Sequence, residues 1–219
     1  MDLNQLSDSG RNRTFLVRLS AALASREDGP LREAMADAEG VCEPVEVEEV
    51  ILQSYLFLGY PISLNAFGLW REVSEREAGP GTEDDWSAWI DRGRGVCSTV
   101  YGGAYEGLRR NVRALHPDME RWMVVEGYGK VLGRPGLDLV SRELCIVALL
   151  AVLGAPRQLY SHLRGALNAG ADPLAVVESL GIAREYLEDT GWGEVWEIWC
   201  QVRARHHGTQ SAHQPESSD

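Results

Sequence analysis

The sequence lacks closely spaced cysteines. Its four cysteines are too far apart along the chain to form a C-x-x-C pair: Cys42, Cys97, Cys145 and Cys200. This spacing favours neither a thioredoxin-like redox motif nor a zinc knuckle. Cys145 lies in an apolar helical pattern, which favours a packed small hydrophobic residue over a nucleophile. We therefore expect reduced thiols, no metal site and no redox pair.

The chain also has too little positive charge for a nucleic-acid-binding protein. It contains 21 Lys and Arg against 33 Asp and Glu, which gives a formal net charge of −12. A surface that binds nucleic acid is basic, and an anionic membrane surface would repel this chain. A small anionic substrate is still compatible, because a pocket responds to local charge rather than to net charge.

Long apolar runs are absent as well. The longest is about half of what spans a bilayer. The first residues, Met1–Gln5, are polar, and no basic segment precedes an apolar one, so no signal peptide is visible. We expect a cytoplasmic protein without membrane contact.

No stretch alternates apolar and polar residues for long enough to predict a strand. Apolar residues instead recur at spacings of three and four, for example over Leu16–Leu23, Val50–Leu58 and Leu174–Ile182, which is the helical period. The sequence therefore predicts an all-α fold.

Turn-forming residues divide the chain, and Gly79-Pro80-Gly81 is the strongest linker signal. Both ends are polar and are expected to be disordered. The expected segments are a disordered N-terminus over 1–13, an N-terminal helical hairpin module over 14–78, a linker over 79–103, a second helical module over 104–206 and a disordered tail over 207–219.

Two parts of the chain repeat each other at an offset of 95 residues. The residues Glu48, Leu58, Gly59, Pro61 and Leu64 recur as Glu143, Leu153, Gly154, Pro156 and Leu159. Each copy is typical of a helix, a tight corner and a returning helix. Phe67 occupies in the first copy the position that His162 has in the second. This indicates two related hairpins, of which only the second carries chemical groups.

The second hairpin combines a carboxylate with a histidine. Ser141 is expected to cap the first helix, with Arg142 and Glu143 in its first turn. His162 lies midway along the returning helix, where it can come within reach of Glu143 and form a proton relay near neutral pH. In the alternative interpretation Glu143 only complements the helix dipole, and His162 makes a single hydrogen bond in the core.

Two further groups of residues allow two interpretations each. Arg134 and Arg142 flank the entrance to the hairpin, where guanidinium groups suit a substrate carboxylate; alternatively they pair with acidic residues of the chain. The three tryptophans Trp192, Trp196 and Trp199 share one helix face. That face either covers the core or forms a subunit interface.

Part of the chain resembles the carboxymuconolactone decarboxylases and the related alkyl hydroperoxidase D proteins. The resemblance covers roughly residues 93 to 180 and rests on Glu126–Asp138, Ser141–Leu144, Leu153–Ala155 and Ser161–Gly170, which follow one another in the family's order. Residues 45–71 resemble another helical segment of the family, which normally follows the histidine helix, so the unit looks permuted or duplicated. The resemblance implies an alkyl hydroperoxidase D-like bundle of helical hairpins that assembles as trimers or hexamers.

The peroxidase branch of this family has a C-x-x-C between its glutamate and its histidine. Glu143 and His162 match the outer pair, but Ala155 and Gln158 stand at the cysteine positions. Thiol peroxidase activity by that route is therefore not expected. The decarboxylase branch needs no thiol, metal or organic cofactor.

The resemblance implies a cofactor-free decarboxylase that acts on a small anionic substrate, a carboxylated lactone such as γ-carboxymuconolactone. In this interpretation His162 returns a proton to carbon and Glu143 orients the imidazole. Arg134 or Arg142 holds an anionic group, and Tyr128 lines the pocket.

Two other functions stay open. One is a non-catalytic helical protein that uses the same oligomeric fold as a binding scaffold. The other is a redox protein that has lost its C-x-x-C and uses Cys97 or Cys145 singly.

Overall fold

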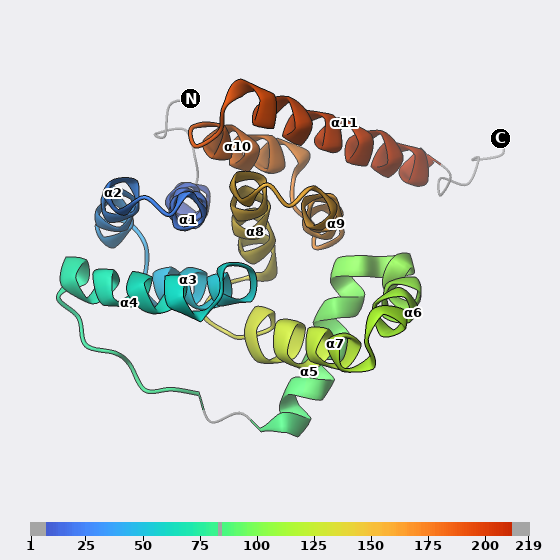
Figure 1. Ribbon diagram of the computed structural model, residues 1–219, viewed down its shortest axis with the longest axis horizontal. Coiled ribbons are helices and arrows are strands. Elements are labelled where there is room, and N and C mark those ends of the chain that lie inside the picture. Colours follow the sequence, from blue (N-terminus) through green and yellow to red (C-terminus); the bar gives the residue numbers. More distant parts are fainter. Residues whose placement is uncertain (1–7, 83–84, 212–219) are drawn as a thin grey trace, which may run out of the picture.

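A computed structural model of the protein describes residues 8–82 and 85–211, and all regular structure in these ranges is helical (Figure 1). The predicted all-α fold is confirmed. In chain order the elements are α1 (Asp8–Ser25), α2 (Asp28–Glu39), α3 (Pro44–Leu58), α4 (Tyr60–Ser74), α5 (Trp86–Tyr101), the 3₁₀ turn η2 (Gly102–Ala104), α6 (Tyr105–Leu115), α7 (Pro117–Trp122), the π-helix η3 (Met123–Leu132), α8 (Leu139–Leu153), α9 (Pro156–Asn168), α10 (Pro173–Arg184) and α11 (Asp189–Ser211).

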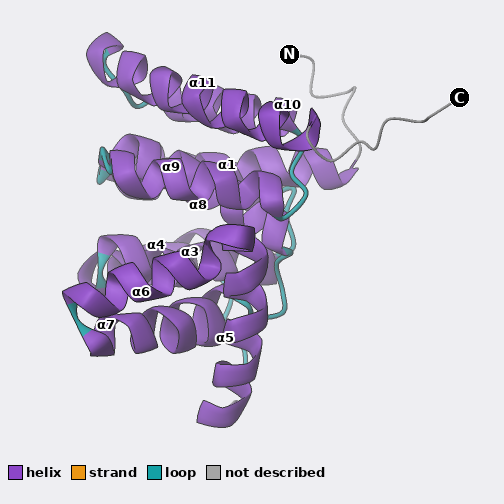
Figure 2. Cartoon of the chain, turned by 90° about the vertical axis from the view of Figure 1, so that its right-hand side faces the viewer, coloured by secondary structure: helices purple, strands orange, loops and turns teal. Residues whose placement is uncertain are grey.

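Helix α8 is the centre of the fold. Every residue from Ser141 to Ala151 is buried, and a helix that is apolar all round needs neighbours on all sides. In Figure 1, α1 and α9 flank α8, α10 and α11 lie above it, and the segment from α3 to α7 lies below. Figure 2 shows the same arrangement from the side as stacked layers of helices. A continuous apolar core extends from Leu16 in α1 to Val202 in α11, and no described helix is long and apolar enough to cross a membrane.

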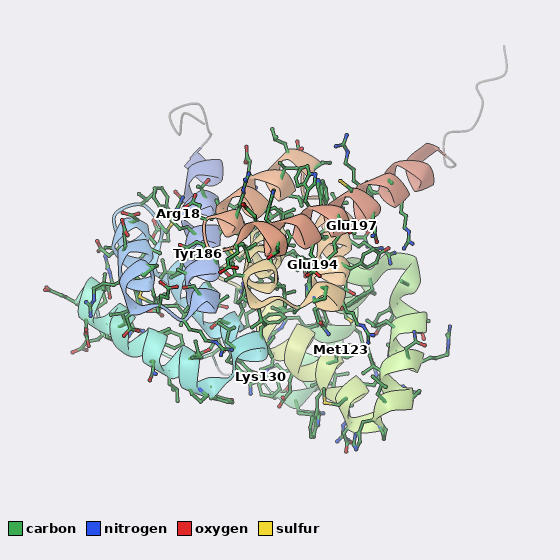
Figure 3. The ribbon with its side chains drawn as sticks, turned by 45° about the horizontal axis from the view of Figure 1, so that its top comes forward. Arg18, Met123, Lys130, Tyr186, Glu194 and Glu197 are labelled. Carbon is green, nitrogen blue, oxygen red and sulfur yellow. The ribbon has the colours of Figure 1, made fainter. Side chains whose placement is uncertain are left out.

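The two ends of the chain contain more helix than the sequence predicted. Helix α1 begins at Asp8, inside the stretch expected to be disordered, because it packs along α8. There Arg13 Nε donates to Ser141 Oγ at 3.1 Å. Farther along α1, Arg18 pairs with Glu185 beside Tyr186 (Figure 3). At the other end, α11 extends to residue 211. The remaining parts of the expected disordered ends, residues 1–7 and 212–219, lie outside the described residues.

The linker expected over 79–103 is mostly helix α5, so this prediction is wrong. Gly93 in this helix permits a close helix crossing and does not mark a turn. A Cβ placed on Gly93 of α5 would lie 2.1 Å from the carbonyl oxygen of Val124, and one on Gly129 of η3 would lie 2.0 Å from that of Trp89. Only glycine permits such an approach of two backbones. Beside the crossing, the ammonium of Lys130 (labelled in Figure 3) lies 5.3 Å from the centroid of the Trp89 ring.

The internal repeat corresponds to two hairpins of the same construction. Helices α3 and α8 both contain 15 residues and begin and end at equivalent positions. Their corners are Gly59, with φ of 82°, and Gly154, with φ of 69°. Both values lie in the left-handed region that glycine adopts without steric cost. The duplication inferred from the sequence therefore has a structural counterpart in α3–α4 and α8–α9.

We expect Gly129→Ala to destabilise the protein by about 1–3 kcal/mol, because the new methyl group overpacks the crossing with α5. Gly127→Ala is the matched control in η3, since a Cβ at Gly127 meets no atom within 4 Å. The control is expected to be neutral or stabilising by up to about 1 kcal/mol. Urea unfolding followed by circular dichroism measures both variants, and equal midpoints would contradict the role assigned to the crossing.

Candidate active site

Glu143 of α8 and His162 of α9 meet inside the protein. His162 Nδ1 lies 2.8 Å from Glu143 Oε2. The glutamate side chain is fully buried, and that of the histidine is 7% exposed. The hairpin corner at Gly154 turns α9 back along α8 and so brings the two residues face to face. The structure therefore places together the two residues that the sequence predicts as catalytic.

The start of α8 differs from the prediction. Asp138, not Ser141, is the N-cap: its carboxylate accepts from the Ser141 backbone N–H at 3.0 Å and from the Ser141 hydroxyl at 2.6 Å. Because α8 begins at Leu139, Glu143 lies beyond the first turn, where the helix dipole has little effect. Complementing the dipole therefore does not account for this buried carboxylate.

The space around the pair is tightly filled. A Cβ on Gly165 of α9 would lie 2.7 Å from Val100 Cγ1 and 2.8 Å from Glu143 Oε2. Glycine at this position is what lets α9 approach both α5 and α8. The Asn168 side-chain amide donates to the Val100 carbonyl at 2.9 Å, so the end of α5 is fixed against the site.

The contact with Glu143 sets the tautomer of His162. Since Nδ1 faces the Glu143 carboxylate, the neutral ring carries its proton on Nδ1 and presents Nε2 as an acceptor. The ring of Phe57, from the end of α3, meets the imidazole edge-on with the centroids 5.7 Å apart. The first hairpin therefore helps to hold the orientation of the histidine ring.

Tyr128 is buried in the π-helix η3, and its hydroxyl donates to the Tyr101 hydroxyl at 3.0 Å. Burial, with smaller contributions from Tyr101 and Glu143, raises the pKa of Tyr128 well above its usual value. Burial also raises the pKa of Tyr101 to about 12. Both phenols are therefore protonated at neutral pH. Sequence reasoning missed Tyr101, because it lies in the segment expected to be a linker.

The two predicted substrate-binding arginines belong to a different cluster. Arg142 is fully buried, and its Nη2 lies 2.7 Å from Glu49 Oε2. Arg134 Nε donates to both carboxylate oxygens of Glu49, at 3.0 and 3.2 Å, and its Nη1 donates to Thr82. Glu49 of α3 is the partner of both arginines, and the sequence did not reveal it because nothing in the helical pattern distinguishes it from its neighbour Glu48.

Arg142 is not placed to hold a substrate, contrary to the expectation. Its remaining donors reach the Leu137 carbonyl at 3.1 Å, the Gln53 side chain at 3.3 Å and the Arg134 carbonyl at 3.0 Å. Successive residues of a helix point about 100° apart, so Arg142 faces α3 whereas Glu143 faces α9. The side chain of Arg142 therefore connects two hairpins instead of lining the site.

Neither Glu143 nor His162 lines any of four surface grooves formed by the described residues. A groove of about 590 Å³ lies between α2 and α4, where Leu31, Leu64 and Glu72 form part of its lining, and neither member of the pair reaches it. The chemical groups lie instead in the packed interior between α5, α8 and α9.

The tryptophan face of α11 is divided between core and surface. Trp199 is buried in the core, whereas Trp196 is exposed. Trp192 packs against Trp196 with the ring centroids 5.5 Å apart, and the guanidinium of Arg184 lies over its ring. The three rings therefore do not form one continuous surface stripe.

Buried thiols do not support the redox alternative. Cys97 and Cys145 are fully buried. Burial raises the pKa of Cys97 to about 12 and raises that of Cys145 further, so neither forms the reactive thiolate near neutral pH. Burial likewise raises the pKa of Cys42 to about 12, and Cys200 is the exposed cysteine.

We expect Ellman's reagent at pH 8 to label one thiol of the native protein rapidly and the other three only after denaturation. Cys200→Ser is the control that should abolish the rapid phase, because Cys200 is exposed. Rapid labelling of a second thiol would contradict this assignment and restore the redox interpretation.

We expect Glu49→Ala to destabilise the protein by about 3–5 kcal/mol, because it leaves the Arg142 charge buried without its partner. The neighbouring variant Glu48→Ala is the matched control. Glu48 pairs with Arg71 at 2.7 Å, but both side chains are partly exposed, so its loss should cost about 1 kcal/mol or less. Urea unfolding compares the two, and similar losses would show that burial of the Glu49 cluster does not matter.

Comparison with known proteins agrees with this geometry. Residues 117–198 match the model of the carboxymuconolactone decarboxylase family, and this segment contains Tyr128, Glu143 and His162. The chain is also 26% identical over 171 residues to "Peroxisomal protein 2" of Schizosaccharomyces pombe, an alignment that covers 74% of this chain and 78% of that protein. Residues 117–198 are therefore similar to the carboxymuconolactone decarboxylase family.

Proposed function

We propose that this chain is a cofactor-independent decarboxylase that acts on a carboxylated lactone such as γ-carboxymuconolactone. The observation that supports this function is the buried hydrogen bond between Glu143 and His162 within the family segment. Ala155 and Gln158 replace the two cysteines of the peroxidase branch, so the pair has no redox partner at those positions. Proton transfer is the chemistry that the two side chains can perform together.

In the proposed reaction, the bond between the carboxylate carbon and the ring carbon breaks and carbon dioxide leaves. The electron pair stays on the ring carbon and is delocalised into the lactone carbonyl as an enolate. One proton then adds to carbon, and the imidazolium of His162 is its donor. The histidine regains a proton from solvent, so each turnover consumes one substrate carboxylate and one proton. Such general acid catalysis contributes about 10²–10⁴-fold in rate.

Glu143 has two tasks in this scheme. Its hydrogen bond to Nδ1 fixes the ring so that Nε2 faces the substrate, and its negative charge stabilises the imidazolium that donates the proton. A buried setting strengthens this interaction, because little water screens it. For the anionic group of the substrate, Arg134 is the arginine of the Glu49 cluster that stays partly accessible, with 19% of its side chain exposed.

A non-catalytic binding scaffold is the alternative function. It is favoured by exposed apolar side chains around the corner between α6 and α7, where Leu115, Met119 and Trp122 face solvent. Such a surface suits contact with another protein chain, including the homotrimer or homohexamer expected from the family.

The relative from Schizosaccharomyces pombe is named for the peroxisome, so the cytoplasmic location expected from the sequence stays a proposal.

We expect the purified protein to release carbon dioxide from γ-carboxymuconolactone, with a parallel change in ultraviolet absorbance. His162→Ala should lower the turnover number by at least about 10²-fold, because the proton donor is lost. His116→Ala is the matched control: His116 is exposed and caps α7 through a bond from the Asp118 N–H to its Nδ1, so its turnover should be unchanged. Full turnover of His162→Ala would exclude the proton-donor role, and an inactive wild-type protein would favour the scaffold.

A further inference from the structure

One oxygen of the Glu143 carboxylate has no hydrogen-bond partner among the described residues. Oε2 is held by His162, but Oε1 is fully buried and unpaired. An unpaired buried polar atom costs about 1–3 kcal/mol, and more for a charged group. Native proteins seldom leave such an atom without a water or ligand as its partner. The free oxygen therefore marks a place that a polar group occupies.

The end of α5 is anchored next to the Glu143 carboxylate. Val100 packs against the same face of Gly165 that Glu143 Oε2 contacts, and its carbonyl accepts from the Asn168 amide at 2.9 Å. Gly102 also lies against Asn168, since a Cβ on Gly102 would be 3.5 Å from the Asn168 amide nitrogen. The residue between these two anchors is Tyr101, so its backbone position is fixed on both sides.

The Tyr101 hydroxyl can donate a hydrogen bond. It accepts the hydrogen bond of Tyr128 at 3.0 Å, and the two rings meet edge to face with centroids 5.8 Å apart. Because a phenol oxygen that accepts from a neighbour still carries its own proton, Tyr101 can donate onward. Tyr101 and Glu143 thus present an unused donor and an unused acceptor, with no direct bond between them.

We propose that Tyr101 is a positioning residue of this site, whose hydroxyl holds Glu143 Oε1 through one bridging water. Tyr128 orients Tyr101, and Glu143 in turn orients His162, so that a single hydrogen-bonded chain extends from η3 to α9. The water accepts from Tyr101 and donates to the carboxylate, which satisfies both unused groups. This inference rests on the proposed function for its effect on turnover, but not for the placement of Tyr101.

The placement can be tested without turnover. Full-length protein carrying 3-fluorotyrosine is titrated by ¹⁹F NMR, with the Tyr101 signal assigned from Tyr101→Phe. The groups that act on the Tyr101 phenol are Tyr128, Glu143 and Cys97. Glu143→Gln should move the Tyr101 midpoint to lower pH by about half a unit or more, because a negative charge is removed. The control Glu106→Gln removes an exposed carboxylate beside Tyr105 and should leave the Tyr101 midpoint unchanged.

The role in positioning is tested by turnover of γ-carboxymuconolactone. Tyr101→Phe should lower the turnover number on the order of tenfold, as is typical when an outer hydrogen-bond partner of a functional histidine is lost. The Michaelis constant should stay unchanged, because Tyr101 does not touch substrate. Tyr128→Phe should have a smaller effect. Unfolding temperatures of both variants, which remove only a hydroxyl, identify any general loss of folding.

The outcomes separate this inference from the proposed function. If the wild-type protein is inactive on the lactone but Glu143→Gln moves the Tyr101 midpoint, the proposed substrate fails and the placement of Tyr101 stands. If the midpoint does not respond to Glu143→Gln, or a folded Tyr101→Phe protein keeps full turnover, the inference is overturned whether or not the decarboxylase is active.

Discussion

The arrangement of the site depends on the buried ion pair between Arg142 and Glu49. Removing both charges from water costs free energy. This desolvation cost is offset here because the guanidinium of Arg142 also donates to the Leu137 and Arg134 carbonyls and to Gln53. Arg142 and Glu143 are successive residues of α8. The pair that fixes one face of α8 against α3 therefore also sets the rotation of α8, and with it the direction in which Glu143 points toward His162.

Glycine provides the second constraint, because the site lies where helices approach unusually closely. Gly93 and Gly129 let α5 cross η3 with backbone against backbone, and this crossing brings Tyr101 alongside Tyr128. Gly165 then lets α9 contact both Val100 and Glu143. The residues with the smallest side chains thus determine where the largest polar groups of the site meet, since a methyl group at any of the three positions would separate the helices.

The sequence alone was sufficient to predict the parts of the fold that depend on local residue patterns. Corner glycines at Gly59 and Gly154 define both hairpins, and the spacing from Glu143 to His162 predicts their encounter, which the structure confirms. Helix α5 was missed because Gly93 serves a tertiary contact, whereas glycine in the sequence has the local signature of a turn. The partner of Arg142 was missed because the choice between Glu48 and Glu49 depends on helix rotation, which no local pattern specifies.

The two hairpins share a construction but differ in how their charges are satisfied, and this difference separates anchoring from chemistry. In the first hairpin Glu48 pairs with Arg71 near the surface, and Phe67 stands where the second hairpin has its histidine. Glu49 is satisfied completely by two arginines from the second module. In the second hairpin Glu143 keeps one buried oxygen that has no hydrogen-bond partner in the described part of the chain. A carboxylate whose bonds are all made to the protein serves as an anchor, whereas one with a free oxygen can bind a further polar group, such as the bridging water that we propose. Duplication followed by this divergence leaves the first hairpin with a fully paired carboxylate and the second with the Glu143–His162 pair that we propose as the site.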